Sequence, residues 1–448
     1  MLVTKAAPYH SPFPDDSIFF GHGKLGYWVL CGFIPSAWFT LPPLIDRIGG
    51  MVSLNWIYVS TWTLCVTLLS VRLMLVRGDR LPLLFSLVLL LFVAYAGISI
   101  IWADSPIDSL RYYPKLLLMG ALFVTCALES RLDSERGLQL IRRGISVFLV
   151  ISVLAELLLH SILWEGQVHF QGLTGRYMTK FYALFAGMFS LAAWFVHRKT
   201  IDLMNAVGAI AISLWILQRG TIASFVIGMM IMVCALGVSG SGKRIAMPIV
   251  LFAIIFVVSM GWLFFTEFGA KYMFYSQDGT DDFIQTLFGG DLAAASSMIH
   301  LKGRDGLWQL ALEALPISVF GAGLATSAIV VGELESVGDG RIELHNDWLQ
   351  YLLDLGLLGV GMYLLVWVGT IAMAWRYCKS TDGTLRMLAL ATLGFGSALA
   401  INSSVDHVLT YHTASAPLGI VAGLLIRRRI ELIRACRSTP TVSHWHHA

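Results

Sequence analysis

Three arginines and one histidine in this chain lie in short polar stretches beside long apolar runs. They are Arg176, Arg219, Arg304 and His345. A guanidinium group binds phosphate oxygens through two parallel hydrogen bonds, and a histidine can take up a proton near neutral pH. If the four residues meet on one face, they predict group transfer from a donor that carries a phosphate or pyrophosphate, with the histidine as the base.

Each of these residues also has an ordinary structural explanation. An arginine at a membrane surface often snorkels, and for any one of the three arginines this explanation is as good as an anion site. His345 alone is explained by a local hydrogen bond at the start of a helix. The functional interpretation therefore depends on the four residues lying together at an outer membrane face, where no cytoplasmic anionic field attracts arginine.

The composition places the chain in a membrane. Hydrophobic residues make up 57% and charged residues 13%, and the mean hydropathy is +0.73. A soluble domain carries about 25% charged residues. These values exclude a soluble globular protein and indicate an integral membrane protein with membrane lipids around it and no nucleic-acid partner.

The expected fold is an all-α integral membrane bundle of about twelve transmembrane helices. Apolar runs of roughly 20 residues mark the spans. They lie near 25–45, 53–75, 81–102, 111–128, 144–164, 179–196, 202–217, 220–238, 246–266, 349–375, 387–403 and 414–426. Only "QRG" separates the seventh run from the eighth, so one long buried helix, and eleven spans in total, is the alternative.

The distribution of basic residues favours twelve spans with both ends in the cytoplasm. This topology places 21 of the 31 Lys and Arg residues in the short cytoplasmic segments, as the positive-inside rule requires. No cysteine then falls in an external loop, so no external disulfide framework is expected.

The same topology defines five regions along the chain. They are a cytoplasmic N-terminal tail at 1–24 without a cleavable signal, helices one to nine at 25–266, a periplasmic segment at 267–347, helices ten to twelve at 348–426, and a cytoplasmic tail at 427–448. The periplasmic segment contains apolar residues at helical spacing, so we expect short amphipathic helices over the membrane face.

Three motifs resemble the O-antigen ligase and O-antigen polymerase superfamily. The run 345-HNDWLQYLLDLGLLG-359 is similar to its His-Asn signature, and 303-GRDGLWQLALEALPISVFGAGLATS-327 is similar to its "Gly-Arg…Trp…Pro…Gly-x-Gly" stretch. The turn 217-LQRGTIASF-225 resembles its "Ser-Arg-Gly" turn, with Gln218 in place of serine. The chain departs from the family at Phe181, where members often have Asn.

The resemblance implies an inverting membrane glycosyltransferase of the GT-C type, without a metal or other cofactor, in a bacterial inner membrane. The donor would be a glycan on undecaprenyl pyrophosphate at the periplasmic face. The acceptor would be the lipid A–core oligosaccharide in a ligase, which we favour, or a second lipid-linked glycan in a polymerase of O-antigen or exopolysaccharide.

The resemblance also assigns roles to residues. His345 would be the general base, Arg219 and Arg304 would bind the pyrophosphate, and Arg176 is a weaker third candidate. Asn346 and Gln350 would orient the histidine or a sugar, although packing at a helix start explains them equally well. Asp347 is expected to cap the helix that starts at residue 348.

Other motifs and one other class of protein compete with this interpretation. The run 237-GVSGSGKR-244 imitates a phosphate-binding loop but has Arg244 where Ser or Thr is needed. In 403-SSVDHVLTYH-412, Asp406 and His407 form either a second acid/base site or a polar turn near the main site. A polytopic transporter is the more distant alternative, but its long connection would lie midway along the chain and inside.

Overall fold

The computed structural model describes residues 54–163, 176–216, 219–238, 304–334, 344–409 and 412–438, together with the single residue Ile254. Within these ranges every regular element is a helix, as the sequence predicts. The long helices are α3 (Leu54–Arg77), α4 (Leu83–Ile98), α5 (Pro106–Leu128), α6 (Ser134–Leu163), α7 (Arg176–His197), α8 (Thr200–Ile216), α9 (Arg219–Val238), α17 (Gly356–Tyr377), α18 (Gly383–Asn402) and α19 (His412–Ser438). The short helices are η1 (Gly78–Arg80), η2 (Ser99–Trp102), α14 (Arg304–Ala314), α15 (Thr326–Leu334) and α16 (Asp347–Asp354).

Five of the described helices contain segments long and apolar enough to cross a membrane. These segments are Leu83–Trp102, Lys180–His197, Gly220–Gly237, Gly356–Tyr377 and Gly383–Asn402. The prediction of a helical membrane protein therefore agrees with the described part of the chain. The number twelve stays a prediction, because five segments of the described residues meet this criterion and the spans expected near 25–45 and 246–266 lie outside the described residues apart from Ile254.

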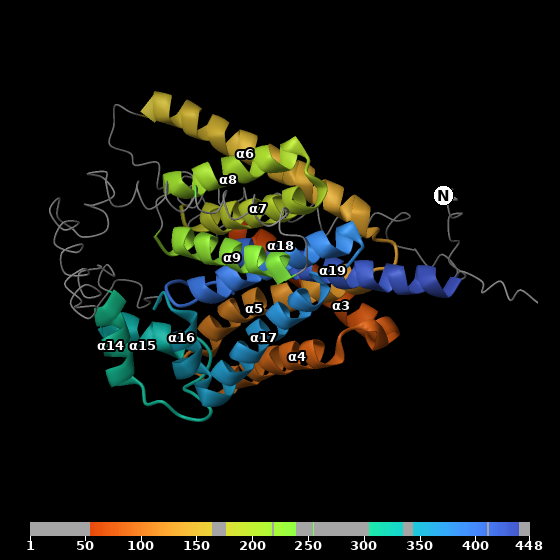
Figure 1. The fold of residues 1–448 in the computed structure, drawn as a ribbon. Helices are drawn as coiled ribbons and strands as arrows, with labels where there is room; N and C mark the ends of the chain where they lie inside the picture. Colours follow the sequence, from red (N-terminus) through yellow and green to blue (C-terminus); the bar gives the residue numbers. More distant parts are fainter. Residues whose placement is uncertain are drawn as a thin grey trace, which may run out of the picture.

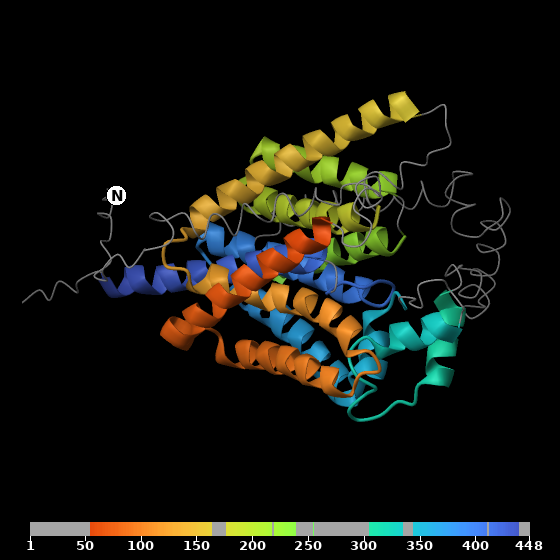
Figure 2. The same cartoon turned by 180° about the vertical axis from the view of Figure 1, so that it is seen from behind.

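The bundle is layered, with α18 and α19 running through its middle. Figures 1 and 2 show α6 and α8 on one side of this pair and α3 and α4 on the other. In the spanning segment of α7, 89% of the residues are buried, and in that of α18, 83% are buried. In the spanning segments of α4 and α17, 33% of the residues are buried. In the described part, α7 and α18 are therefore central, and α4 and α17 present apolar faces outward.

Small residues bring the central helices close together. A Cβ on Gly228 of α9 would meet the backbone of Gly394 on α18, and Cβ atoms on Gly419 and Gly423 of α19 would meet the backbone of α5. Helices in a membrane associate through such close backbone contact, because lipid chains provide little hydrophobic driving force between helices. These contacts fix where α18 and α19 place the loop that joins them.

The helices α8 and α9 are separate, and both pack against α7. Residues 217–218, which join them, lie outside the described ranges. This arrangement fits the turn that the twelve-span prediction places there, and it does not fit a single long helix.

The span expected at 349–375 is wrong as a continuous helix. The chain breaks between α16 and α17 at Gly356, which has a φ of +69°. A segment from 318 to 323 crosses this break and pairs with its backbone through Leu357 N–H to Ser318 O (3.0 Å) and Gly323 N–H to Asp354 O (2.8 Å). The backbone groups that a break leaves without helical partners are satisfied in this way.

The structure describes two of the predicted regions only in part. The described part of the expected periplasmic segment contains the short helices α14 and α15, while 267–303 and 335–343 lie outside the described residues. The last helix, α19, does not end where the cytoplasmic tail is expected to begin, at residue 427, but continues to Ser438.

Candidate functional site

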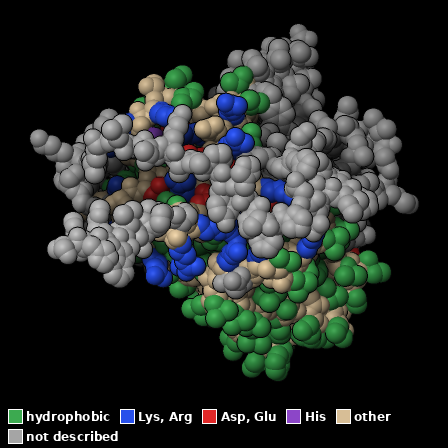
Figure 3. Space-filling model, turned by 90° about the vertical axis from the view of Figure 1, so that its right-hand side faces the viewer, with side chains coloured by type: hydrophobic (Ala, Val, Ile, Leu, Met, Phe, Trp, Pro, Cys, Tyr) green, Lys and Arg blue, Asp and Glu red, His purple; other side chains and the backbone are tan. Residues whose placement is uncertain are grey.

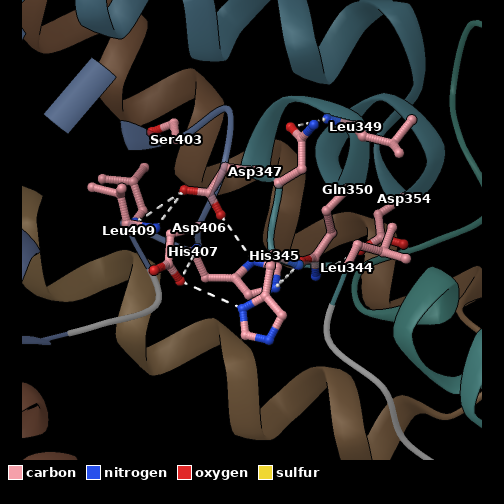
Figure 4. A network of polar contacts seen from close by, with 12 residues as sticks. Leu344, His345, Asp347, Leu349, Gln350, Asp354, Ser403, Asp406, His407 and Leu409 are labelled. Atoms are coloured by element: carbon pink, nitrogen blue, oxygen red, sulfur yellow. Dashed lines mark hydrogen bonds and ion pairs between the residues drawn. The ribbon is translucent and has the colours of Figure 1, made fainter. Parts of the chain in front are cut away.

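The polar residues of the site come together at one end of the bundle. The loop 403–409 between α18 and α19 lies against residues 344–347, which lead into α16, and against the start of α7. Figure 4 shows His345, His407, Asp406 and Asp347 gathered there, and Figure 1 shows α14, α15 and α16 at the same end. Three segments distant in the sequence therefore build one polar site.

His345 has an uncommon backbone conformation, with a φ of +52°. Its backbone N–H donates to Nε2 of His407 at 2.9 Å, and this bond holds the residue in the left-handed region. The ring Nδ1 lies 3.5 Å from Oδ1 of Asp406, and the side chain is 28% exposed. His345 is thus anchored through its backbone, while its ring faces a carboxylate on one side and remains accessible.

Asp406 lies between two basic side chains. Its Oδ2 forms an ion pair with Nζ of Lys180, and its Oδ1 faces His345 and accepts the backbone N–H of His407 at 2.9 Å. Burial raises the pKa of the Asp406 carboxyl, but the His345 side chain and the Lys180 charge lower it by more, so the pKa lies well below its usual range. Asp406 is therefore a carboxylate at every physiological pH.

His407 is fully buried, and its hydrogen bonds define its tautomer. Nε2 accepts the backbone N–H of His345, so this nitrogen carries no proton. Nδ1 lies 3.1 Å from Oδ1 of Asp347 and donates to it. The assignment follows from the hydrogen-bond network. His407 is thus a neutral side chain that positions the backbone of His345, and it is not a second acid/base site in this arrangement.

The expected capping role of Asp347 is wrong. Asn346 is the N-cap of α16, and its side chain accepts the backbone N–H of Leu349 at 3.1 Å. Asp347 is fully buried and accepts the backbone N–H groups of Val408 (2.8 Å) and Leu409 (3.2 Å). Because the loop 403–409 offers backbone donors to this carboxylate, Asp347 fixes the loop that carries Asp406.

Gln350 is fully buried, and its amide donates to Oδ2 of Asp354 at 3.2 Å. Asp354 in turn accepts the backbone N–H groups of Ala325 (2.9 Å) and Ser327 (2.8 Å) at the start of α15. In the described part of the chain, Gln350 therefore supports the contact between α15 and α16, and Asn346 supports the start of α16. The expectation that either residue binds a sugar stays a prediction.

The three predicted arginines share one position, because each is the first residue of a helix. Arg176 begins α7, Arg219 begins α9 and Arg304 begins α14. Their side chains lie outside what the structure describes, so their distances to His345 stay predictions.

The helices that these arginines begin all contact the site. Lys180, one turn into α7, pairs with Asp406. Gly220 at the start of α9 packs against Val405 so closely that a Cβ would overlap it. Trp308, one turn into α14, donates its indole N–H to the carbonyl of Leu344 at 2.7 Å. Three arginine-bearing helix starts therefore converge on the segments beside His345.

Two residues of the candidate site are not expected there from the sequence. The sequence does not single out Lys180, and it predicts a capping role for Asp347. A lysine at the start of a long apolar helix indicates a buried polar contact, because a charged side chain next to hydrocarbon requires a partner. Its partner could not be identified from the sequence, since Asp406 lies 226 residues away.

No cluster of three or more His, Cys, Asp and Glu side chains in the described residues has the arrangement of a metal site. Comparison of the sequence with protein-family models and with curated proteins finds no match.

Proposed function

We propose that this protein is a metal-independent, inverting membrane glycosyltransferase of the O-antigen ligase type. It would have the twelve-helix GT-C-like architecture, lie in a bacterial inner membrane, and act at the periplasmic face. The donor would be a glycan on undecaprenyl pyrophosphate, and the acceptor would be a hydroxyl of the lipid A–core oligosaccharide. One observation carries the proposal: an accessible histidine beside a buried carboxylate lies where three arginine-bearing helix starts converge.

In the proposed reaction, His345 takes the proton of the acceptor hydroxyl as the acceptor oxygen attacks the anomeric carbon of the donor. The bond from that carbon to the pyrophosphate oxygen breaks, and its electron pair leaves with undecaprenyl pyrophosphate. Asp406 stabilises the imidazolium that forms, as a carboxylate does beside a histidine base. The result is one new glycosidic bond with inverted configuration.

The arginines supply the second half of the proposed mechanism. Negative charge grows on the pyrophosphate as the glycosidic bond breaks, and guanidinium groups aimed at it stabilise the transition state. The positive ends of helix dipoles favour anions as well, so an arginine at the first residue of a helix combines two attractions for the same phosphate. This reasoning assigns the pyrophosphate to Arg219 and Arg304, with Arg176 as a third candidate.

The test is transfer in vitro, with purified lipid-linked donor and either lipid A–core or a second lipid-linked repeat as acceptor. His345→Asn is the suitable variant, because Asn tolerates a positive φ better than Ala and leaves the backbone undisturbed. Removal of a general base should reduce the rate on the order of 10²- to 10⁴-fold. His197→Asn, at the other end of α7, is the matched control and should retain activity.

Four results decide the proposal. Transfer to lipid A–core by the wild type and loss of transfer in His345→Asn support a ligase with this base. Transfer only to the second lipid-linked repeat would replace the ligase with a polymerase. Normal transfer by His345→Asn at equal expression would remove the histidine from the mechanism, and absence of transfer to both acceptors would favour a transporter.

A further inference from the structure

Lys180 is a charged residue in an unusually buried position. Its side chain is 1% exposed, and it lies at the start of a spanning segment in which 89% of the residues are buried. Removing an ammonium group from water is energetically unfavourable, and an ion pair offsets this desolvation only with good geometry and further hydrogen bonds. A buried ion pair is therefore weak grounds for assuming that Lys180 serves stability alone.

The two oxygens of Asp406 face different partners. Oδ2 contacts the lysine, while Oδ1 lies 3.5 Å from Nδ1 of His345 and accepts the backbone N–H of His407. One carboxylate thus joins the lysine to the ring of the histidine, and any change in the charge of the lysine acts on His345 through Asp406.

We propose that Lys180 is a positioning residue of the general base, which it serves by balancing the charge of Asp406 so that His345 stays unprotonated. The proposal rests on the function proposed above. With the ammonium present, the carboxylate is already neutralised, and the imidazole can accept the proton of the acceptor. Without it, the carboxylate would be balanced by a proton on His345, and the base would be occupied before the reaction begins.

The charged and titratable groups that face His345 come from four elements in the described part of the chain. They are Asp406 and His407 in the loop 403–409, Asp347 on α16, Lys180 on α7 and Tyr363 on α17, the last acting through Asp347. Asp347 is bound by His407, Tyr363 and two backbone N–H groups, so its charge is already stabilised. Lys180 is the cation in direct contact with Asp406 among these groups.

The first experiment measures transfer between pH 5.5 and 9 in Lys180→Met and Lys180→Arg. Loss of a cation from a contact this close moves the titration of its partners by at least about one pH unit. Lys180→Met should therefore shift the acid limb of the rate profile upward by about one unit, with a loss that approaches about tenfold at the acid end and near-normal transfer at pH 8.5. Lys180→Arg should keep the wild-type profile. A uniform loss at every pH, or an unchanged acid limb, would overturn the proposal.

A second measurement does not depend on transfer. Diethyl pyrocarbonate modifies only unprotonated imidazole, so the rate of His345 modification against pH, followed by peptide mass spectrometry with His197 as internal reference, reports its protonation. The midpoint should move upward in Lys180→Met and stay in place in Lys180→Arg. If the midpoint shifts but the wild-type protein shows no transfer, the proposed glycosyltransferase activity is wrong and the effect of Lys180 on His345 stands. If the wild type transfers normally but the midpoint does not shift, the activity stands and the proposed role of Lys180 is wrong.

A double variant covers the case in which Lys180→Met does not fold. Lys180→Met in an Asp406→Asn background removes both charges and leaves no uncompensated ion. Compared with Asp406→Asn alone, it should show no additional shift in the modification of His345, since the carboxylate that transmits the effect is gone. An additional shift in the double variant would mean that Lys180 acts by another route and would overturn the proposal.

Discussion

The two histidines of the site form hydrogen bonds through different groups. His407 is fully buried with both ring nitrogens in hydrogen bonds, so it has no lone pair left for a substrate. His345 uses its backbone N–H for the bond to His407, and its ring is left beside Asp406 with 28% of its side chain exposed. A general base must reach a substrate proton, and this requirement favours His345 over its neighbour as the proposed base.

The arginines at the helix starts give a prediction at the same scale. An ammonium group is a point charge without the planar fork of guanidinium, so it replaces the charge of an arginine but not two parallel hydrogen bonds to phosphate. Arg219→Lys and Arg304→Lys should each lose about 2–4 kcal/mol of transition-state stabilisation, by analogy with a lost oxyanion donor. The measurement is kcat/KM for transfer with purified lipid-linked donor.

Arg72→Lys provides the matched control, because Arg72 is exposed on α3 and contributes no contact to the site in the described part of the chain. Its activity should equal that of the wild type. Full activity in both Arg219→Lys and Arg304→Lys would mean that these residues only anchor helix starts at the interface, and the pyrophosphate site would have to be sought elsewhere.

The residue types and spacing of its motif identify His345 as a candidate, but they do not identify the residues that contact it. The sequence places Asp406 directly before His407, and the interpretation of that loop as a polar turn near the main site agrees with the structure. The sequence does not identify Lys180 as a partner, because a contact between residues 226 positions apart depends on how α7 packs against the α18–α19 loop. No local pattern in a single sequence encodes that packing.

At the scale of helices, periodicity and apolar runs located the long elements well, but they did not reveal the break after α16. The run around Gly356 is rich in Leu and Gly, and Asp354 is the single charged residue between 349 and 375, so the run looks like one span. The break depends on a partner segment: Tyr95 donates its hydroxyl to the carbonyl of Phe320 at 2.7 Å and thereby holds the segment 318–323 across it. Such a contact between distant segments has no signature in either sequence alone.

Asp354 makes the contact between α15 and α16 dependent on pH. It lies ahead of the span Gly356–Tyr377, and burial raises its pKa from 3.8 to about 6, against the opposing effect of hydrogen bonds from Ser327, Gln350 and Ala325. Because the folded pKa is above the unfolded one, this contribution to stability is complete below about pH 4 and is lost as the pH rises to about 6. The change is at most about 3 kcal/mol, since one pKa unit corresponds to about 1.4 kcal/mol.

Hydrogen exchange in peptides from 318–334, corrected for intrinsic rates, should therefore be slower at pH 5 than at pH 7.5. Asp354→Asn is the control, because an amide does not titrate there and the pH difference should disappear. Equal protection of the wild type at both pH values would mean that the hydrogen bonds to Asp354 outweigh its burial.

Across the whole molecule, the candidate site lies at one end of the helices, and a further group of Lys and Arg side chains lies at the other end. Figure 3 shows Lys and Arg side chains gathered on the end away from α14, α15 and α16. There Arg428 binds Asp382 through two hydrogen bonds (3.1 and 2.9 Å), and Arg427 donates to the carbonyls of Leu132 and Ser130. These contacts join α19 to α18 and to the loop before α6, so the helices that carry the site are held together at the far end as well.

The two ends of α18 offer a direct test of which end faces the periplasm. Ser404 follows the helix and lies in the loop of Asp406, Thr381 precedes it among basic residues, and both are exposed. In a cysteine-free background, Ser404→Cys should react with an impermeant maleimide in intact spheroplasts, and Thr381→Cys only after permeabilisation. The expected direction follows from the excess of Lys and Arg near Thr381, which the positive-inside rule assigns to the cytoplasm. The opposite labelling pattern would place His345 in the cytoplasm, where a donor presented on the periplasmic face cannot reach it, and would remove the proposed substrate together with the orientation.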